Sequence, residues 1–323
     1  MFCHYRLLAY CVFTTAAFAQ TYAPEAGMPG STAIDKNSPL FKAWATAITV
    51  ERGYINKSNP EAMAAGSHFA SAGTDSNALG FPDGNTVSLG DGGTAILTFA
   101  NPITDAAGFD FAVFENGSTT YLELAFVEVS SDGVHFFRFP NESQTQTATQ
   151  LGTFGTPAAN YLNNLAGKYA SQYGTPFDIS ALPDDALLDK SNISHVKIID
   201  VVGSIDSAYA SYDSFGHAVN DSFPTPFASC GFDLQAVGVI NALLGNSEYD
   251  FSGVCIFPNP AADRLYIEGI ENVGATIFDS TGKVMFNAKK IQNGIEVSQW
   301  QPGVYFIDLF TATHRKTIKI IKK

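Results

Sequence analysis

Short apolar runs separated by glycine-rich and polar turns dominate the first three quarters of the chain. Runs rich in Val, Ile and Phe that are bounded by turn residues are typical of strands. They occupy residues 86–89, 94–99, 109–115, 122–130, 135–139, 195–202 and 232–240. The glycine-rich segment 90–93 and the Ser-Asp-Gly segment 131–133 separate neighbouring runs, so we expect hairpins there and consecutive antiparallel strands throughout.

Two segments have helical spacing instead. Phe41, Trp44, Ala45 and Ile48 fall at i, i+3, i+4 and i+7, which predicts an amphipathic helix whose apolar face packs into the core. A second, short helix is expected around residues 158–170.

The last seventy residues form a separate pattern of short alternating strands. Residues 254–323 contain about seven such runs, and the polar turn 279–283 separates two of them. We therefore expect a small C-terminal β-sandwich of the immunoglobulin-like kind.

The charge distribution marks a boundary between two domains. Residues 20–253 carry 8 basic and 25 acidic side chains, whereas residues 254–323 carry 9 basic and 6 acidic ones. The polar stretch 244–253 lies at the change, so we interpret residues 20–243 as an acidic domain, 244–253 as a linker and 254–323 as a second domain. The formal net charge of −13 opposes binding to nucleic acid.

The first nineteen residues have the features of a secretory signal peptide. His4 and Arg6 precede an apolar stretch that ends in Ala-Phe-Ala, which predicts cleavage before Gln20. No later segment has the length of about 20 apolar residues that a membrane-spanning helix needs, so we expect no transmembrane segment in the mature chain. Cys230 and Cys255 remain after cleavage, either as a disulfide or as two unrelated thiols.

The C-terminal domain resembles a known family. Its matching segments, in order, are Phe-Pro-Asn-Pro-Ala at 257–261, Gly-Lys at 282–283, Pro-Gly-Val-Tyr-Phe at 302–306 and a lysine-rich final strand. These segments resemble the C-terminal sorting domain of the type IX (Por) secretion system of Bacteroidota. The resemblance implies a secreted or cell-surface cargo protein whose residues 254–323 interact with the type IX machinery.

The acidic domain has a more general resemblance. The segment 126–133, a strand followed by a Ser-Asp-Gly turn, is similar to segments of galactose-binding-like jelly rolls. The expected fold class is therefore all-β, with a jelly-roll-like β-sandwich followed by the small sorting domain. Jelly rolls include sugar binders, adhesion modules and enzymes, so the resemblance implies no single activity.

The connection 203–229 is the expected ligand site, because long connections inside a compact domain are usually functional or disordered and aromatic side chains argue against disorder. The candidate residues are Asp206, Tyr209, Tyr212, Asp213, Phe215, His217 and Asp221. Aromatic rings interleaved with oxygen acceptors suit carbohydrate, which is the leading ligand class, or calcium. Two alternatives stay open: capture of a corrinoid or another nutrient for a TonB-dependent transporter, and a loop that packs its own aromatic residues.

A structural calcium ion is a further expectation, although no cofactor is certain. Asp75, Asp83 and Asp91 lie among glycines and asparagines that offer the oxygen ligands calcium requires. Their spacing matches no EF-hand.

The sequence gives little support for catalysis. None of the common nucleophile, zinc-peptidase or phosphate-loop motifs occurs. Glu123 and Glu128 would lie on opposite faces of a regular strand, and with Glu115 they are interpreted as solvated strand residues rather than a catalytic pair. We therefore expect a protein that is not an enzyme, with a secreted polysaccharide hydrolase using His217 as the alternative.

Overall fold

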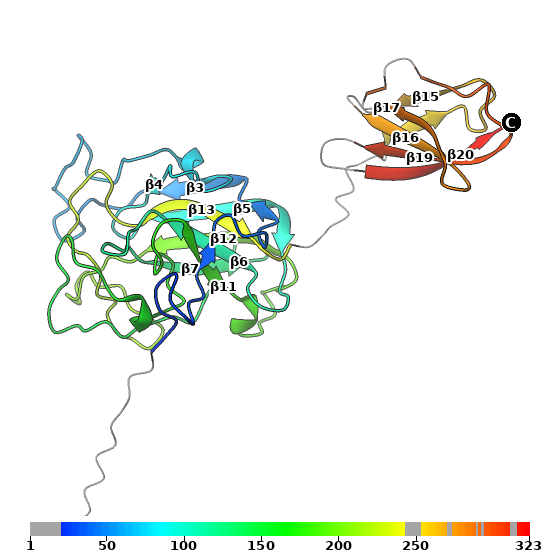
Figure 1. Cartoon of the computed structure of the whole chain (residues 1–323). Coiled ribbons are helices and arrows are strands. Elements are labelled where there is room, and N and C mark those ends of the chain that lie inside the picture. Colours follow the sequence, from blue (N-terminus) through cyan, green and yellow to red (C-terminus); the bar gives the residue numbers. More distant parts are fainter. Residues whose placement is uncertain (1–20, 243–252, 270–272, 289, 292–293, 311–314) are drawn as a thin grey trace, which may run out of the picture. The chain divides into compact units, whose positions relative to one another are not determined.

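The computed structural model describes residues 21–242, 253–269, 273–288, 290–291, 294–310 and 315–323 (Figure 1). The expected signal peptide and nearly all of the expected linker lie outside these residues. The chain divides into two compact units, residues 1–243 and residues 244–323. We call them the large unit and the tail, and describe each by itself.

Two antiparallel sheets make up the large unit. The first has the order β1-β11-β6-β13-β2, with β4 also paired to β13. Its strands are β1 (Ile34–Asp35), β2 (Ala43–Trp44), β4 (Val87–Ser88), β6 (Phe111–Glu115), β11 (Tyr173–Phe177) and β13 (Asp233–Val239).

The second sheet has the order β3-β5-β12-β7-β8. Its strands are β3 (Ala47–Glu51), β5 (Thr94–Ile103), β7 (Ala125–Ser130), β8 (Phe137–Arg138) and β12 (Ile193–Asp200). A separate pair joins β9 (Glu142–Ser143) to β10 (Leu162–Asn163). Three short 3-10 turns complete the unit: η1 (Asp75–Ala78), η2 (Ala159–Tyr161) and η3 (Ile179–Ala181).

The core lies between the two sheets. Phe111 and Phe177 from the first sheet stack at 5.3 Å and pack in one cluster with Val127 and Val196 from the second. Burial of such side chains is the main favourable contribution to folding. The all-β sandwich predicted from the strand pattern is confirmed.

The helix predicted at residues 41–48 is wrong. Trp44 ends β2 in the first sheet, whereas Ile48 lies in β3 of the second sheet, so the chain changes sheets between them. Phe41 and Trp44 cover the outer face of β6 at Phe114, with ring centroids 5.5 and 5.6 Å from the Phe114 ring. The helical spacing arose because two strands bury different faces in succession. The helix expected at 158–170 is likewise reduced to the 3-10 turn η2.

The predicted hairpins have different outcomes. β7 and β8 pair across the Ser-Asp-Gly turn as expected, with Val129 opposite Phe137. β4 does not pair with β5, because β4 joins β13 in one sheet while β5 joins β3 and β12 in the other. The glycine-rich segment 90–93 therefore connects the two sheets; Gly90 and Gly92 have positive φ, which glycine adopts without strain.

The tail is a two-sheet sandwich with seven strands among its described residues. One sheet contains β14 (Cys255–Phe257), β15 (Arg264–Glu268) and β18 (Ile295–Glu296); the other has the order β17-β16-β19-β20. The strands of the second sheet are β16 (Gly274–Asp279), β17 (Val284–Ala288), β19 (Gly303–Phe310) and β20 (Arg315–Lys322). The tail has its own core, which includes Leu265, Ile277 and Ile307.

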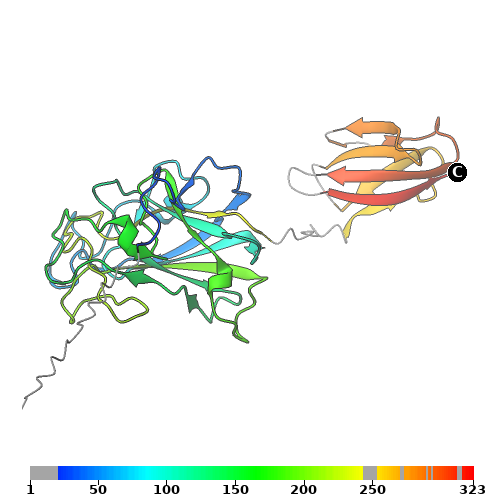
Figure 2. The same ribbon diagram turned by 60° about the horizontal axis from the view of Figure 1, so that its bottom comes forward.

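No helix in the described part of the chain is long and apolar enough to cross a membrane. In Figure 2 the strands of the large unit run across the picture, and long connections gather at one end of the sheets. Hydrogen bonds join these connections, for example from Ser71 N to Ala228 O and from Phe223 N to Leu151 O.

Cys230 and Cys255 are free thiols in different units, which predicts different reactivity. Cys230 is buried and Cys255 is exposed, and burial raises the pKa of the Cys230 thiol. In the purified mature chain a thiol-specific chromogenic reagent should modify Cys255 at once and Cys230 only after denaturation. A Cys255→Ser variant should show no fast phase. A denatured chain that releases no thiol would mean that the two are joined as a disulfide.

Candidate functional site

Midway along the connection between β12 and β13, residues 212–218 form a small hairpin that presents three rings. Tyr212 and Ala218 form a bridge, and Asp213 N donates to His217 O at 2.9 Å. The Asp213 carboxylate closes the turn, because its Oδ1 accepts hydrogen bonds from Phe215 N and His217 N, both at 2.9 Å. We call Tyr212, Phe215 and His217 the aromatic tip.

Asp213 also attaches this tip to the segment around β9. Its Oδ2 accepts a hydrogen bond from Ser143 N at 3.0 Å. Asn141 N donates to Ser214 Oγ at 3.0 Å, and Ser214 N donates to Asn141 O at 3.1 Å. The Asp213 side chain is fully buried. It therefore organises the connection and does not face a ligand.

The rings of the aromatic tip lie outside this support. Tyr212 is 44% exposed and Phe215 is 65% exposed. Phe215 and His217 stack with their ring centroids 6.3 Å apart. His217 Nδ1 lies 3.2 Å from Asp213 Oδ2, which orients the imidazole. The tip is thus an exposed aromatic surface on a fixed backbone.

The other candidates in this connection have separate positions. Asp206 is exposed and closes a turn, since its Oδ1 accepts from Ala208 N and its carbonyl accepts from Tyr209 N. Tyr209 is half-buried. Asp221 is buried, and its carboxylate accepts hydrogen bonds from Leu124 N and Ser222 N at 2.8 and 2.7 Å. Asp221 therefore belongs to the interior of the sandwich end.

That end of the large unit collects several buried carboxyl groups. Paired strand ends converge there, because Asp200 lies opposite Ala125 and Glu115 lies opposite Leu234. The acids at this end are the buried Asp91, Glu115, Glu123, Asp200 and Asp221 and the half-buried Asp233. None of the six is in an ion pair within the described residues.

Burial shifts the protonation of these groups. Desolvation raises the pKa of Asp91 and Asp233 to about 6 and that of Asp221 to about 7. Desolvation, with the neighbouring acids as the further cause, raises the pKa of Glu115 and Glu123 well above the ordinary value. Glu123 Oε1 accepts a hydrogen bond from the Tyr121 hydroxyl at 3.1 Å.

The three expected calcium ligands do not come together. Asp75 pairs with Arg52 at 3.8 Å, and Asp83 accepts hydrogen bonds from the backbone and side chain of Asn85. Asp91 is buried and accepts from Lys57 N at 2.7 Å. Each carboxylate thus has its own local partner.

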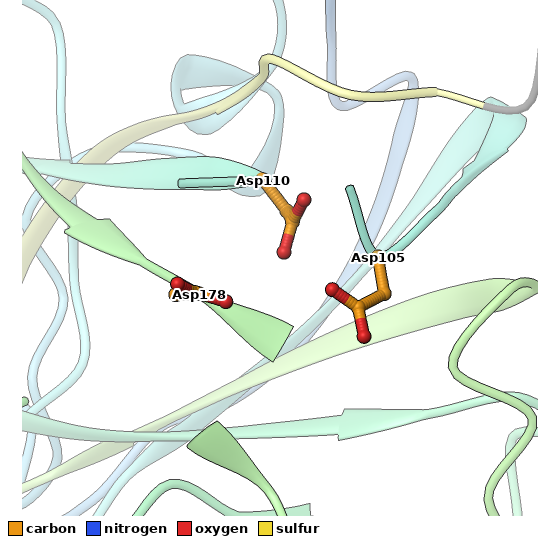
Figure 3. Close-up of side chains that lie close together, drawn as sticks. All are labelled: Asp105, Asp110 and Asp178. Atoms are coloured by element: carbon orange, nitrogen blue, oxygen red, sulfur yellow. The ribbon is translucent and has the colours of Figure 1, made fainter. Parts of the chain in front are cut away.

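Another acidic group has ligand spacing. One carboxylate oxygen from each of Asp105, Asp110 and Asp178 lies within 4.8 Å of the others, around a common space (Figure 3). The group is at the opposite end of β6 from Glu115. The buried Asp110 carboxylate already accepts hydrogen bonds from Ala106 N, Ile179 N and the Asn241 side chain. Sequence reasoning missed this group because Asp178 is distant in the sequence from Asp105 and Asp110.

Of the three glutamates considered for a catalytic pair, Glu128 lies apart from the other two. Glu128 forms ion pairs with Arg138 at 2.9 Å and Lys197 at 3.8 Å on the outer face of its sheet. The expectation of solvated side chains is wrong for Glu115 and Glu123, which are both buried near one another. Strand periodicity did not predict this because the loop 116–122 lies between them. Glu115 Oε2 accepts a hydrogen bond from Gly117 N at 2.5 Å.

Comparison with known proteins identifies the tail. Residues 255–323 match the family described as the secretion system C-terminal sorting domain. The chain is therefore a type IX secretion cargo, and it is secreted or carried on the outer cell surface. No curated protein matches the chain.

Two solved structures are similar in part. One is PorZ, a bacterial surface component of the type IX secretion system of Porphyromonas gingivalis, with 17% identity over 28% of this chain and 14% of PorZ, at a TM-score of 0.21. The other, described as the BSP domain of a biofilm associated protein, has 9% identity over 88% of this chain and 53% of its own, at a TM-score of 0.21. This chain thus spans about a seventh of PorZ and about half of the second protein.

The raised pKa values of the buried acids predict how stability depends on pH. A carboxyl whose pKa is higher in the folded state binds more protons there, so the free energy of unfolding falls as pH rises from about 4 through the folded value. We expect a higher melting temperature at pH 5 than at pH 8. Glu123→Gln, which keeps the acceptor for Tyr121, should reduce this difference; the exposed Asp206→Asn should not. Stability that rises from pH 5 to pH 8 would contradict the prediction.

The same measurement tests the calcium expectation. A cation that binds only the folded chain raises its melting temperature. If calcium binds through Asp91, the buried member of the expected ligand set, its addition at pH 8 should raise the melting temperature of the wild type more than that of Asp91→Asn. Unchanged melting temperatures with calcium and with chelator would exclude a structural calcium ion.

The sorting tail predicts the fate of a truncated chain. A chain without residues 254–323 should not cross the outer membrane, because the secretion machinery recognises that domain. Immunodetection on intact cells and in the medium should find the full chain, including a Phe215→Ala variant, and should not find the truncated one. External arrival of the truncated chain would contradict the assignment.

Proposed function

We propose that this type IX cargo is a non-enzymatic binding protein whose aromatic tip binds carbohydrate outside the cell. The observation that carries the proposal is the pairing of exposed rings with a buried support. Tyr212, Phe215 and His217 are exposed, while the Asp213 carboxylate beneath them accepts three backbone hydrogen bonds.

A rigid ring surface suits a sugar for physical reasons. The apolar C–H faces of a pyranose stack on aromatic rings, and the polar edges of tyrosine and histidine supply hydrogen bonds. Because Asp213 fixes the turn before any ligand arrives, little conformational entropy is lost on binding. The open surface also leaves room for a polymer to extend past the tip.

Charge narrows the class of carbohydrate. The segment 20–253 has 25 acidic and 8 basic side chains, and a strongly negative domain repels polyanions at moderate ionic strength. Neutral glycans are therefore favoured over sulfated or uronic-acid polymers. A corrinoid or another flat nutrient would use the same rings, and the experiment below separates the two.

A hydrolase is the second candidate, and one observation favours it. The buried Asp213 carboxylate lies 3.2 Å from His217 Nδ1, an arrangement that orients a histidine for general base catalysis. A nucleophile would have to lie within hydrogen-bond distance of that imidazole. Among the described residues, the side-chain hydrogen bond of His217 goes to Asp213, and no serine, threonine or cysteine bonds to it.

The binding proposal predicts the effect of removing each ring. Tyr212→Ala and Phe215→Ala should each weaken binding to a neutral glycan by about tenfold, since an aromatic contact contributes roughly 0.5–1.5 kcal/mol beyond its area. A glycan array followed by titration calorimetry measures this. Phe154→Ala is the matched control, because Phe154 is 76% exposed but lies outside the tip, where it stacks on Phe227.

The same variants distinguish the alternatives. If no glycan binds but a corrinoid does, and Phe215→Ala removes corrinoid binding, the aromatic tip is the binding site and carbohydrate is the wrong ligand class. Polysaccharide cleavage that is lost in His217→Ala would replace the binding proposal with the hydrolase. Full glycan affinity in both ring variants would exclude the tip as the site.

A further inference from the structure

A cavity of about 450 Å³ lies on the large unit, apart from the residues of the aromatic tip. The segment after the expected cleavage site forms one wall through Pro24 and Met28. Leu122, Pro157 and Ala159 contribute apolar surface from two connections, and Lys168 lines the same space. Its volume is within the usual range for a small-molecule site.

Lys168 is the notable lining residue, because a lysine is rarely buried without an acidic partner. It is only 5% exposed. Its ammonium donates to Leu162 O at 2.7 Å and to Ala23 O at 3.1 Å. An ammonium has three N–H donors, so these two carbonyls leave one.

No carboxylate of a described residue lies within 4.0 Å of this ammonium. Burial alone lowers the pKa of Lys168 to about 8, with no contribution from a neighbouring charge. The acidic lining residue Glu25 is exposed and forms no ion pair with it. The Tyr169 ring centroid lies 5.2 Å from the ammonium. Apart from this ring and the two carbonyls, the lysine charge has no partner among the described residues, although the unit is acidic.

The backbone around Lys168 is held in one conformation. The preceding residue, Gly167, has a φ of +81°, and a Cβ atom there would lie 1.8 Å from Glu123 O. Ala166 forms a bridge with Ala125 at the start of β7. Leu122 N donates to Thr156 Oγ1 at 3.1 Å, which joins two walls of the cavity. The ammonium and the apolar walls are therefore placed before a ligand binds.

We propose that this cavity binds a small organic acid with one acidic group, whose carboxylate pairs with Lys168 and whose apolar body packs against Leu122, Pro157 and Ala159. A carboxylate supplies the charge that the buried ammonium lacks, and charge-assisted hydrogen bonds are the strong ones. The single cation and the exposed Glu25 disfavour ligands with several negative charges. This site is independent of the aromatic tip.

Two probes of equal shape test the charge requirement. 2-Naphthoate and its neutral analogue 2-naphthamide differ in the acidic group and share the apolar body. Ligand-observed NMR and calorimetry on the purified mature chain should give at least about tenfold tighter binding for the naphthoate, a difference of about 1.4 kcal/mol. Equal affinities, or no naphthoate binding at millimolar concentration, would overturn the proposal.

Variants then place the site. Lys168→Met should remove the preference for the acid, while Lys190→Met should retain it, because Lys190 pairs instead with Asp184 at 2.8 Å. Ala158→Trp is a second variant that does not touch the lysine, since Ala158 is an exposed residue of the cavity lining. It should weaken naphthoate binding at an unchanged melting temperature. Undiminished binding in Ala158→Trp would show that the naphthoate binds elsewhere and would overturn the assignment even if Lys168→Met does not fold.

Discussion

Buried backbone N–H groups need acceptors, and in this protein aspartate side chains supply them where strands do not. A buried amide without a partner costs roughly 1–3 kcal/mol, so long connections can pack closely only if each one is satisfied. Asp200 accepts from Gly92 N and Phe232 N and so joins the connections before β5 and β13. Asp213 accepts hydrogen bonds from three amides, Phe215 N and His217 N in the aromatic tip and Ser143 N in β9, and so joins these two segments.

This use of carboxylates explains why an acidic chain with long connections is ordered. Asp221 accepts from Leu124 N and Ser222 N, and Asp110 accepts from Ala106 N and Ile179 N. Each of these side chains joins segments that are distant in sequence by accepting hydrogen bonds from both. The consequence is electrostatic: burial raises the pKa of Asp200 and Asp221, and the neighbouring acids raise that of Asp200 further.

The sequence predicted the strands well because most strands bury a continuous apolar face. The long strands β5, β7, β12 and β13 and the seven strands of the tail were all expected from apolar runs. The pattern at 41–48 misled because its residues bury faces of two different sheets, which mimics a helical period. Pairing of β4 with β13 could not be predicted, since strand order is a long-range property that local periodicity does not contain.

The site was predictable in part for the same reason. Tyr212 and Phe215 could be predicted as site residues from the sequence, because they are aromatic residues in a long connection with many polar residues. The structure shows that both are exposed. The residue type alone does not distinguish Asp213 and Asp221 from acids that bind a ligand. Only their hydrogen bonds to backbone amides show that they join segments of the chain instead. The sequence did not indicate Lys168 as a site residue. What distinguishes this lysine is burial without a charged partner, which only the structure shows.

The two proposed sites differ in the ligands that their shapes admit. The aromatic tip is convex and open, so a ligand gains contact on one side only and must be long or bound at several points to bind tightly. In the cavity the Lys168 ammonium is buried, so an acidic group that reaches it gains more than it would from an exposed lysine. A single polymer chain therefore cannot satisfy both, and the large unit is suited to two chemically unrelated ligands.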